Sequence, residues 1–543
     1  MSSYDVIVIG AGAGGGVAAG VLAEAGKRVL LLERGEALSF EEIGRDHLRN
    51  HRLSRYGHNT GPELLGNPRV LVDPLGDAHL VRPHEPGYNN NAACVGGGTR
   101  VFGAQAWRFL PEDFRMASTY GVPEGSSLAD WPIGYEDLEP YYEQAEWELG
   151  VAGDDGEHTG RWPRRRPYPM PPMPVNNQGK TLRAGARRLG WETRPVPFLI
   201  NTVPYGGRDI CIRCQHCVGF ACPTDAKNGS QNTLVPRALA TGLCDLVTGA
   251  MVTRIDVDSS GRVSGVTFVD RAGEVHQVRA EVVVCAAGAI ETARLLLLSR
   301  SAHHPRGLGN GHDQVGRHLQ GHYYPGAAGL LPEPVWDGLG PGPSTATCRF
   351  NHGNEDVIGG GMLADEFVVL PVIFAKRIVP PDVPRWGQAN KDFMREAYTR
   401  MLHVIGPVHE IPSPEARVTL DPDVRDRWGL PVVRLSGTTH PETVRTATFM
   451  AERAKEWLLA SGAQQVWGRK PELFLSAGQH QAGTCRMGDD PAASVVDLWG
   501  RIHGHDNLYV ADASVHVTNG GFNPVLTIHA LAFRTAGHIA RSW

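Results

Sequence analysis

Three polar residues near the C-terminus could carry out chemistry together. His480 begins the run His-Gln-Ala-Gly-Thr, Asp512 follows an apolar stretch, and Asn523 precedes Pro524. A neutral imidazole can take a proton from an alcohol, because the unperturbed pKa of histidine lies near neutrality. Most of the 23 histidines are expected to be structural, so the case for His480 depends on its context. We predict that this tail supplies a base, a polar partner and a contact to a cofactor.

Glycines near the N-terminus have the spacing of a dinucleotide site. Residues 10–15 read Gly-Ala-Gly-Ala-Gly-Gly, which matches G-x-G-x-x-G. Gly10 permits a tight turn, Gly12 lets the backbone approach a pyrophosphate, and Gly15 lets a helix pack closely on a strand. Glu33 stands at the distance expected for an acceptor of adenosine ribose hydroxyls. The motif predicts a bound dinucleotide and does not separate NAD from FAD.

A second glycine run lies at residues 95–103. It includes Gly97 and Thr99 within Val-Gly-Gly-Gly-Thr-Arg. Glycine allows the backbone to approach a flat ring or a phosphate closely, whereas a flexible surface loop is the ordinary alternative.

Four cysteines are clustered within twelve residues, at Cys211, Cys214, Cys217 and Cys222. Their spacing differs by one residue from the ferredoxin run C-x2-C-x2-C-x3-C-P. Three interpretations stay open. The thiols could hold an iron–sulfur cluster that relays electrons, they could bind zinc, or they could be thiols or disulfides in a loop beside the cofactor domain.

The elements around these motifs predict an α/β fold. A strand at 4–9, a helix at 14–26 and a strand at 28–32 form a βαβ unit. Residues 251–257, 262–269 and 274–285 alternate with turn residues and indicate a β-meander, which a helix at 291–299 follows. We expect residues 36–93 to be irregular, the prolines of 162–174 to form an extended connector, and 417–420 and 431–434 to be strands.

Composition excludes several classes of protein. The chain has 543 residues, 41% hydrophobic and 20% charged, with a net charge of −5, so no basic field suggests nucleic acid as a partner. No apolar run is long enough to cross a membrane, and the first strand begins too early for a secretory signal. With nine cysteines, of which four are clustered, we predict a cytoplasmic protein.

Taken in order, these motifs resemble the glucose–methanol–choline (GMC) family of flavin oxidoreductases. The blocks that carry the resemblance are residues 10–15, Glu33, 95–103, 137–142, 286–290, 315–319, 480–488, 507–514 and 523–524. Residues 330–470 match poorly, as is expected for the part that meets the substrate.

The resemblance implies a Rossmann-like FAD-binding domain interleaved with an α+β substrate domain built on an antiparallel sheet. We assign residues 1–115, 225–320 and 476–543 to the first domain, and 116–224 and 321–475 to the second.

The same resemblance assigns the cofactor contacts. Val252 would meet the adenine, Asp512 the ribityl chain or pyrophosphate, and Asn523 with Pro524 the flavin ring. Ala287 is a further expected cofactor contact. Some members attach FAD covalently to a histidine, but the corresponding position here is about Val101. No histidine lies between Gly96 and Trp107, so we expect non-covalent FAD.

The implied reaction is the oxidation of an alcohol to a carbonyl, with hydride transfer to flavin N5. His480 would act as the base and Asn523 would hold the substrate oxygen, so activity should fall below about pH 6.5. A hydroxyl of a sugar, glycoside or aminoglycoside is the expected substrate, and Phe367, Phe374 or Trp386 could stack on a pyranose. Oxygen or another redox carrier would accept the electrons, and the sequence does not separate oxidase from dehydrogenase. A lyase of the same family and a dehydrogenase with an iron–sulfur relay are the alternatives.

Overall fold

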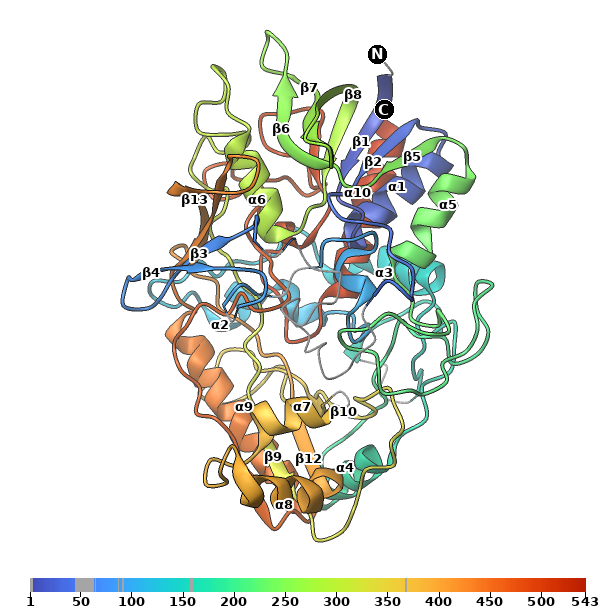
Figure 1. Ribbon diagram of the computed structural model, residues 1–543, viewed down its shortest axis with the longest axis vertical. Coiled ribbons are helices and arrows are strands. Elements are labelled where there is room, and N and C mark those ends of the chain that lie inside the picture. The colour runs from blue at the N-terminus through green and yellow to red at the C-terminus, as the bar shows by residue number, and fades with distance from the viewer. Residues whose placement is uncertain are drawn as a thin grey trace.

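The computed structural model describes residues 3–43, 63, 65–85, 87–89, 92–156, 161–366 and 369–543. Three β-sheets organise this part of the chain. The ends marked N and C lie close together at one end of the molecule. Helices α4 (Asn177–Arg188), α8 (Gly387–Ala397) and α9 (Pro441–Ala460) lie toward the other (Figure 1).

The first sheet has seven strands and a parallel core. Its strands are β5 (Cys244–Val247), β2 (Val29–Leu32), β1 (Ser3–Ile9), β8 (Val275–Cys285), β7 (Val263–Val269), β6 (Met251–Val257) and β16 (Leu508–Val510). β1 pairs in parallel with both β2 and β8, and β16 pairs in parallel with the end of β8. β6, β7 and the first half of β8 form the predicted antiparallel meander.

Helices cover the parallel core because its strands are apolar on both faces. All four residues of β2 are buried, as are Val6 to Ile9 of β1. Helix α1 (Ala13–Glu24) packs against α5 (Leu234–Ala240) and α10 (Val525–Ser542). The contact with α10 brings the two ends of the sequence together.

The second sheet has five strands and is antiparallel throughout. In order they are β10 (Ala346–Thr347), β11 (Leu363–Asp365), β12 (Met401–Ile405), β9 (Gly326–Leu330) and β15 (Gln465–Trp467). Helix α9 (Pro441–Ala460) packs on this sheet and on α4 (Asn177–Arg188). The predicted α/β class, with a separate antiparallel sheet, is therefore confirmed.

The third sheet corrects the expectation for residues 36–93. It joins β13 (Arg417–Arg425) and β14 (Pro431–Ser436) to β3 (Arg69–Val72) and β4 (Ala78–Val81). β14 and β3 are parallel, with Arg434 opposite Val70. The short strands β3 and β4 lie within the segment predicted to be irregular. They pair with each other as a hairpin, and the other partner of β3, β14, is far away in the sequence. Strands of four residues carry too little periodicity to be recognised from sequence.

Of the other helices, α6 (Ala289–Leu298) matches the helix predicted at 291–299. The others are α2 (Met116–Tyr120), α3 (Tyr135–Leu149), α7 (Pro371–Ile373) and α8 (Gly387–Ala397). α3 is anchored by Glu146, which accepts a bidentate pair of hydrogen bonds from the buried Arg108 at 2.8 and 2.7 Å. The three segments assigned to an FAD-binding domain all contribute strands to the first sheet, while the domain boundaries stay a prediction.

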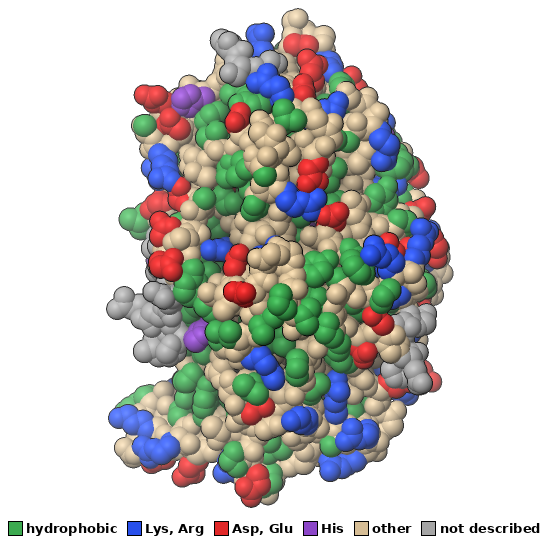
Figure 2. Space-filling view, turned by 90° about the vertical axis from the view of Figure 1, so that its right-hand side faces the viewer, with side chains coloured by type: hydrophobic (Ala, Val, Ile, Leu, Met, Phe, Trp, Pro, Cys, Tyr) green, Lys and Arg blue, Asp and Glu red, His purple; other side chains and the backbone are tan. Residues whose placement is uncertain are grey.

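The surface mixes charges of both signs. On the face shown in Figure 2, acidic and basic side chains are interspersed and gather in no field of one sign. Among the described helices, none combines the length and the apolar character that crossing a membrane requires.

Candidate active site

The predicted dinucleotide turn at residues 10–15 packs so closely that several of its positions have no room for a side chain. Gly10 has φ +100°, and a Cβ there would lie 2.6 Å from the carbonyl oxygen of Ala286. A Cβ on Gly15 would lie 1.8 Å from the Gly10 oxygen, so only glycine lets α1 approach β1 this closely. Gly14, which sequence analysis did not assign, has the same function against the carbonyl of Ala511.

The N-terminus of α1 has the donors that a pyrophosphate needs. Gly12 is the N-cap and has no side-chain cap, so the first N–H groups of the helix receive no side-chain acceptor. Gly12 and Ala13 are partly accessible, whereas the next seven residues are buried. These groups fit the phosphates of a dinucleotide.

Glu33 lies beside this turn and is buried. Its two carboxylate oxygens accept the N–H groups of Ala11 and Gly35, each at 2.9 Å. Burial raises the pKa of Glu33, and these hydrogen bonds only partly offset that rise. Each oxygen keeps a further acceptor site, which fits the predicted ribose contact. The Ala250 N–H bonds to the Glu33 carbonyl at 2.9 Å, which places β6 and Val252 close to the proposed adenine end.

The second glycine run packs directly on the first. The Gly96 N–H donates to the Ala11 carbonyl at 2.9 Å. A Cβ on Gly97, which has φ +50°, would lie 3.0 Å from the Cα of Gly12. Thr99 is buried and donates to the Gly96 carbonyl at 2.7 Å, which closes the turn. The structure thus brings Gly12 and Gly97 together, as a shared cofactor site requires.

Asp512 holds two loops together. Its carboxylate accepts the N–H of Gly288 at 2.9 Å and the Thr292 hydroxyl at 2.6 Å on one oxygen, and the N–H and hydroxyl of Ser514 on the other. Thr292 in turn accepts the Ala287 N–H at 3.1 Å. These four bonds occupy the usual acceptor capacity of a carboxylate. Asp512 therefore positions the Ala287 turn, and a direct contact with a cofactor would have to replace one of these bonds.

His480 is paired with a second histidine that sequence analysis did not single out. Nδ1 of His480 lies 2.8 Å from Nδ1 of His322. Nε2 of His322 lies 3.1 and 2.9 Å from the carbonyl oxygens of Asn519 and Gly520, so it must carry hydrogen. Burial lowers the pKa of His322 to about 4, which keeps this ring neutral, with an unprotonated Nδ1.

The tautomer of His480 follows from this pairing. Because Nδ1 of His322 is an acceptor, Nδ1 of His480 must be the donor, and Nε2 of His480 then keeps its lone pair. Among the residues that the structure describes, none forms a hydrogen bond with this Nε2. The arrangement presents an unprotonated ring nitrogen, as a general base requires.

The environment of His480 favours the neutral ring. Burial, with His322 alongside, lowers the pKa of His480 well below 6.5. The acid limit of activity stays a prediction, and the lowered pKa of the ring would place that limit below the pH of 6.5 expected for an unperturbed histidine. His480 also has φ +59°, an uncommon conformation for a residue with a side chain. Asn519 supports it by donating from Nδ2 to the carbonyls of His480 and Gly321, both at 2.8 Å.

Asn523 is linked to His480 through a tyrosine. Its Nδ2 lies 3.1 Å from the Tyr324 hydroxyl, which lies 3.3 Å from Nδ1 of His480. Oδ1 of Asn523 is buried without a hydrogen-bond partner among the described residues. Pro524 is the N-cap of α10, so the positive end of this long helix begins beside the histidine pair. The predicted catalytic residues are thus brought together.

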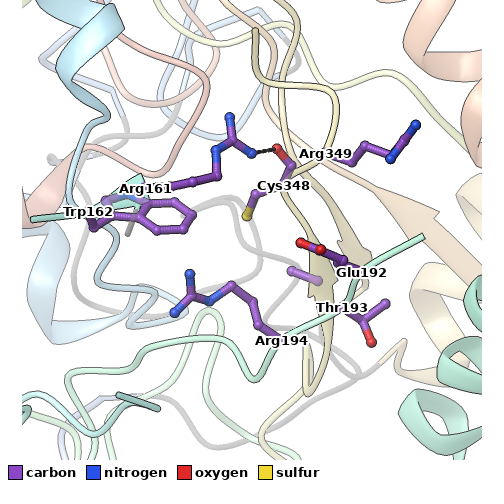
Figure 3. A pocket seen from close by; sticks show the side chains of 8 residues that line it. Arg161, Trp162, Glu192, Thr193, Arg194, Cys348 and Arg349 are labelled. Atoms are coloured by element: carbon purple, nitrogen blue, oxygen red, sulfur yellow. Dashed lines mark hydrogen bonds between the residues drawn. The ribbon is translucent and has the colours of Figure 1, made fainter. Parts of the chain in front are cut away.

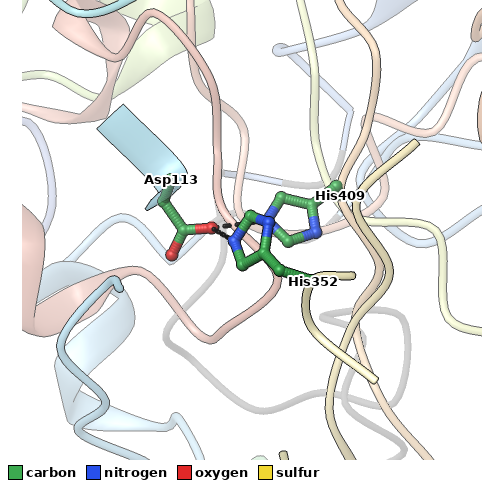
Figure 4. A group of neighbouring side chains, drawn as sticks. All are labelled: Asp113, His352 and His409. Carbon is green, nitrogen blue, oxygen red and sulfur yellow. Dashed lines mark hydrogen bonds and ion pairs between the residues drawn. The ribbon is translucent and has the colours of Figure 1, made fainter. Parts of the chain in front are cut away.

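One carboxylate and two more histidines form a second cluster of polar side chains. The carboxylate of Asp113 faces Nε2 of both His352 and His409, the former at 3.0 Å (Figure 4). The His352 Nδ1 lies 2.9 Å from the Tyr120 hydroxyl, and the His409 Nδ1 lies 3.1 Å from the N–H of Gly360. Burial opposes ionisation of Asp113, yet His409 and His352 lower the pKa of its carboxyl. The hydrogen bonds within this triad tie three distant segments together.

The four clustered cysteines lie against the second glycine run. The Gly219 N–H donates to the carbonyl of Val101 at 2.7 Å. Buried Lys227 donates to the carbonyls of Phe102, Cys217 and Phe220 at 3.0, 2.6 and 2.8 Å. Burial lowers the pKa of this ammonium to about 8. The cysteine loop is therefore fixed to the predicted flavin loop.

The proposed stacking aromatics are not gathered at this site. Phe374 is fully buried in a separate hydrophobic cluster with Ile373 and Ile378, so it has no free face. Trp386 is 84% exposed, and Phe367 lies outside the described residues.

Sequence reasoning missed His322, Tyr324 and Asn519. The first two come shortly after residues 315–319, one of the blocks that carried the resemblance, and Asn519 comes shortly before Asn523. Extending each block by a few residues would have included all three, although their contacts to His480 depend on the fold.

Comparison with known proteins agrees with the motifs. Two family models, both described as GMC oxidoreductase, match residues 14–324 and 412–532. The chain is 33% identical to 6'''-hydroxyparomomycin C oxidase of Streptomyces lividus, over 99% of this chain and 91% of that protein. It is 30% identical to the fructose dehydrogenase large subunit of Gluconobacter japonicus, over 99% and 98%. Among solved structures, pyridoxine 4-oxidase from Mesorbium loti matches with a TM-score of 0.65, 19% identity and 99% coverage of both chains.

Proposed function

Because the chain belongs to the GMC oxidoreductase family, we propose that it uses FAD to oxidise an alcohol group of a sugar, a glycoside or an aminoglycoside to a carbonyl. The observation that carries the proposal is the unprotonated Nε2 of His480, fixed by His322. The named relatives, an aminoglycoside oxidase and a fructose dehydrogenase subunit, support this substrate class.

The residues present fit FAD. The N–H groups at Gly12, the bare backbone at Gly97 and the acceptor sites of Glu33 would hold the dinucleotide, with Asp512 positioning the turn beside it. When bound, FAD supplies the oxidant, because its flavin accepts the hydride from the alcohol carbon. A covalent link would require a histidine at the position that Val101 occupies. We therefore infer that the cofactor is held without a covalent bond.

The proton of the alcohol is handled by the protein. His480 would accept it at Nε2, and the hydrogen bond from His480 Nδ1 to His322 keeps the ring in the tautomer that can do so. Asn523 uses one Nδ2 hydrogen on Tyr324 and keeps a second for the substrate oxygen. Burial of His480 disfavours its charged form. The ring therefore stays neutral and able to accept a proton before the substrate binds.

The electron acceptor is the second part of the proposal. Oxygen or another redox carrier would reoxidise the flavin, in the cytoplasm. A relay through an iron–sulfur cluster at the four cysteines is the second candidate, because Lys227 and Gly219 fix their loop to Val101 and Phe102. Analysis for iron and acid-labile sulfide tests the relay.

Anaerobic flavin reduction tests the main reaction. The purified enzyme is mixed with sugars, glycosides, aminoglycosides and simple alcohols without oxygen, and the loss of oxidised-flavin absorbance is followed. We expect rapid bleaching by at least one polyhydroxy compound, loss of bleaching in His480→Ala, and normal bleaching in His79→Ala, a change at an exposed histidine of β4. Product formed without bleaching would indicate the lyase alternative instead, and bleaching at the normal rate in His480→Ala would overturn the assignment of the base.

A further inference from the structure

Two imidazoles and one carboxylate converge in a cluster that the proposed reaction does not use. The three side chains are Asp113, His352 and His409, and their ligand atoms all lie within 4.8 Å of one another (Figure 4). Nε2 of both histidines faces Oδ1 of Asp113, at 3.0 Å for His352. Two imidazole nitrogens and a carboxylate oxygen form the donor set of many zinc and non-haem iron sites. The cluster therefore has the ligand types that a divalent transition metal ion prefers.

The outer nitrogens of the two histidines have partners that suit either tautomer. Nδ1 of His352 lies 2.9 Å from the Tyr120 hydroxyl, which can donate or accept. Nδ1 of His409 lies 3.1 Å from both the N–H and the carbonyl oxygen of Gly360. Each ring can therefore carry its hydrogen at Nδ1 and present a lone pair at Nε2 to a metal ion. Partners of this kind fix the ligating histidines of metal sites in general.

The carboxylate of Asp113 is also held from outside the cluster. Its second oxygen, Oδ2, accepts the N–H of Leu110 at 2.6 Å, at the start of the short helix Pro111–Phe114. In the part of the chain that the structure describes, its ion-pair partners are the two histidines, with no lysine or arginine. A buried carboxylate is costly without a cation, and a divalent ion at Oδ1 would supply the charge that neutral imidazoles lack.

Metal binding requires only a small opening of the cluster. Zn–N bonds of about 2.0–2.1 Å at tetrahedral angles place ligand atoms about 3.4 Å apart. Oδ1 of Asp113 and Nε2 of His352 are already 3.0 Å apart, and the contact with His409 must widen by about 1 Å. The His352 side chain keeps 7% of its exposure, whereas those of the other two keep at most 1%. An ion, with water as a fourth ligand, would therefore enter beside His352.

The loop that carries His352 is fixed by hydrogen bonds to distant segments. Cys348 lines a pocket at the start of this loop, and its carbonyl accepts a hydrogen bond from Arg161 at 2.6 Å (Figure 3). Next to the histidine, Nδ2 of Asn351 donates to the carbonyl of Gly521 at 3.3 Å. These bonds limit the movement of the ligand, which lowers the entropy lost when an ion binds.

His409 places the cluster next to the segment that leads to Asn523. A Cβ on Gly521 would lie 2.9 Å from Cε1 of His409, so the ring packs on the backbone of that glycine. The Thr518 hydroxyl donates to the Asp113 carbonyl at 3.2 Å. An ion bound here would join distant segments to the backbone before Asn523, and it would take no part in the transfer of hydride or proton.

We propose that Asp113, His352 and His409 bind one divalent transition metal ion of the zinc class, which stabilises the fold. Each ring would lose its hydrogen at Nε2 and gain one at Nδ1 by exchange with water. Tyr120 and Gly360 would then accept the hydrogens at Nδ1. The site does not rest on the proposed oxidation, because it uses none of the residues assigned to FAD or to the alcohol.

Zinc titration of the FAD-bound enzyme tests the site. The protein is treated with EDTA and passed through gel filtration, Zn²⁺ is added, and bound zinc and Tm are measured. We expect zinc to raise the Tm of the wild type, because an ion that binds the folded state stabilises it. His352→Gln should bind one equivalent less zinc and lose this rise. Binding by the four clustered cysteines is common to both proteins and cancels in the comparison.

Two further variants separate a built site from surface binding. His276→Gln changes an exposed histidine that also lies beside a carboxylate, and it should behave like the wild type. Tyr120→Phe removes the acceptor for Nδ1–H of His352, so zinc affinity should fall about tenfold to a hundredfold. Equal zinc content and equal Tm shifts in wild type and folded His352→Gln would overturn the proposal. If His352→Gln does not fold, Tyr120→Phe decides instead, and undiminished affinity in that variant would overturn it.

Discussion

The pairing of His322 with His480 leads to a sharp prediction about two substitutions at one position. The amide oxygen of asparagine stands near the place of histidine Nδ1, whereas the amide nitrogen of glutamine stands near that of Nε2. His322→Asn therefore keeps an acceptor for Nδ1–H of His480 and loses the donor to Asn519 and Gly520. His322→Gln keeps the donor to Asn519 and Gly520 and loses the acceptor for Nδ1–H of His480. The two variants therefore distinguish two roles of His322, which are to fix the tautomer of His480 and to support the backbone at Asn519 and Gly520.

The size of the effect follows from the hydrogen bond that is lost. A buried donor without its acceptor costs about 1–3 kcal/mol, and roughly 1.4 kcal/mol corresponds to a tenfold change in rate. The Tyr324 hydroxyl, 3.3 Å from the same Nδ1, offers His480 a longer substitute. We therefore expect His322→Gln to reduce the rate of flavin reduction about tenfold to a hundredfold, and His322→Asn to stay within about threefold of the wild type.

The assay is single-turnover anaerobic flavin reduction with the fastest alcohol from the substrate screen. Thermal unfolding and flavin content of each variant are measured in parallel, because His322 is buried and both changes remove one hydrogen bond. A backbone-support role would slow His322→Asn at least as much as His322→Gln. Equal rates in the two variants, or a fully active His322→Gln, would refute the proposed control of the tautomer.

Three further predictions concern the folded protein and its cofactor. Burial lowers the pKa of His318 to about 2 and of His529 to about 3, whereas both titrate near 6.5 when unfolded, so unfolding takes up protons and stability falls as the pH drops below 6.5. Chemical denaturation at pH 7 and 5.5 should show a slope above about 1.4 kcal/mol per pH unit, the value for a single proton. Asp512→Asn removes an acceptor of the Gly288 N–H and should lower the flavin retained on gel filtration, unlike Asp506→Asn at the surface. Acid precipitation should release the yellow colour into the supernatant, and colour in the pellet would contradict non-covalent FAD.

Local patterns were sufficient to predict the fold class and the family. The glycine turn at residues 10–15, the βαβ unit and the β-meander depend on residues close in sequence, and all are found in the structure. The short strands β3 and β4 escaped prediction although they pair with each other, and the second partner of β3 is β14, more than three hundred residues later. A strand of four residues carries too little periodicity to be recognised alone.

The candidate site shows the same limit at the level of side chains. His480 and Asn523 were predicted from their contexts, but the ring that determines the tautomer of His480 comes from a segment 158 residues away. Asp512 was predicted as a cofactor contact, and its four hydrogen bonds to Gly288, Thr292 and Ser514 show a positioning function that sequence cannot reveal.

The packing of α1 on α10 has a consequence for how the chain is made. Residues 13–24 are synthesised long before residues 525–542, which cover them. During synthesis the cofactor turn therefore lacks its covering helix, and the first sheet lacks β16 until residue 510 is added. Contacts of such long sequence separation make folding slow and dependent on synthesis of the later segments. A nascent chain is thus expected to acquire its flavin only after residues 525–542 have been made.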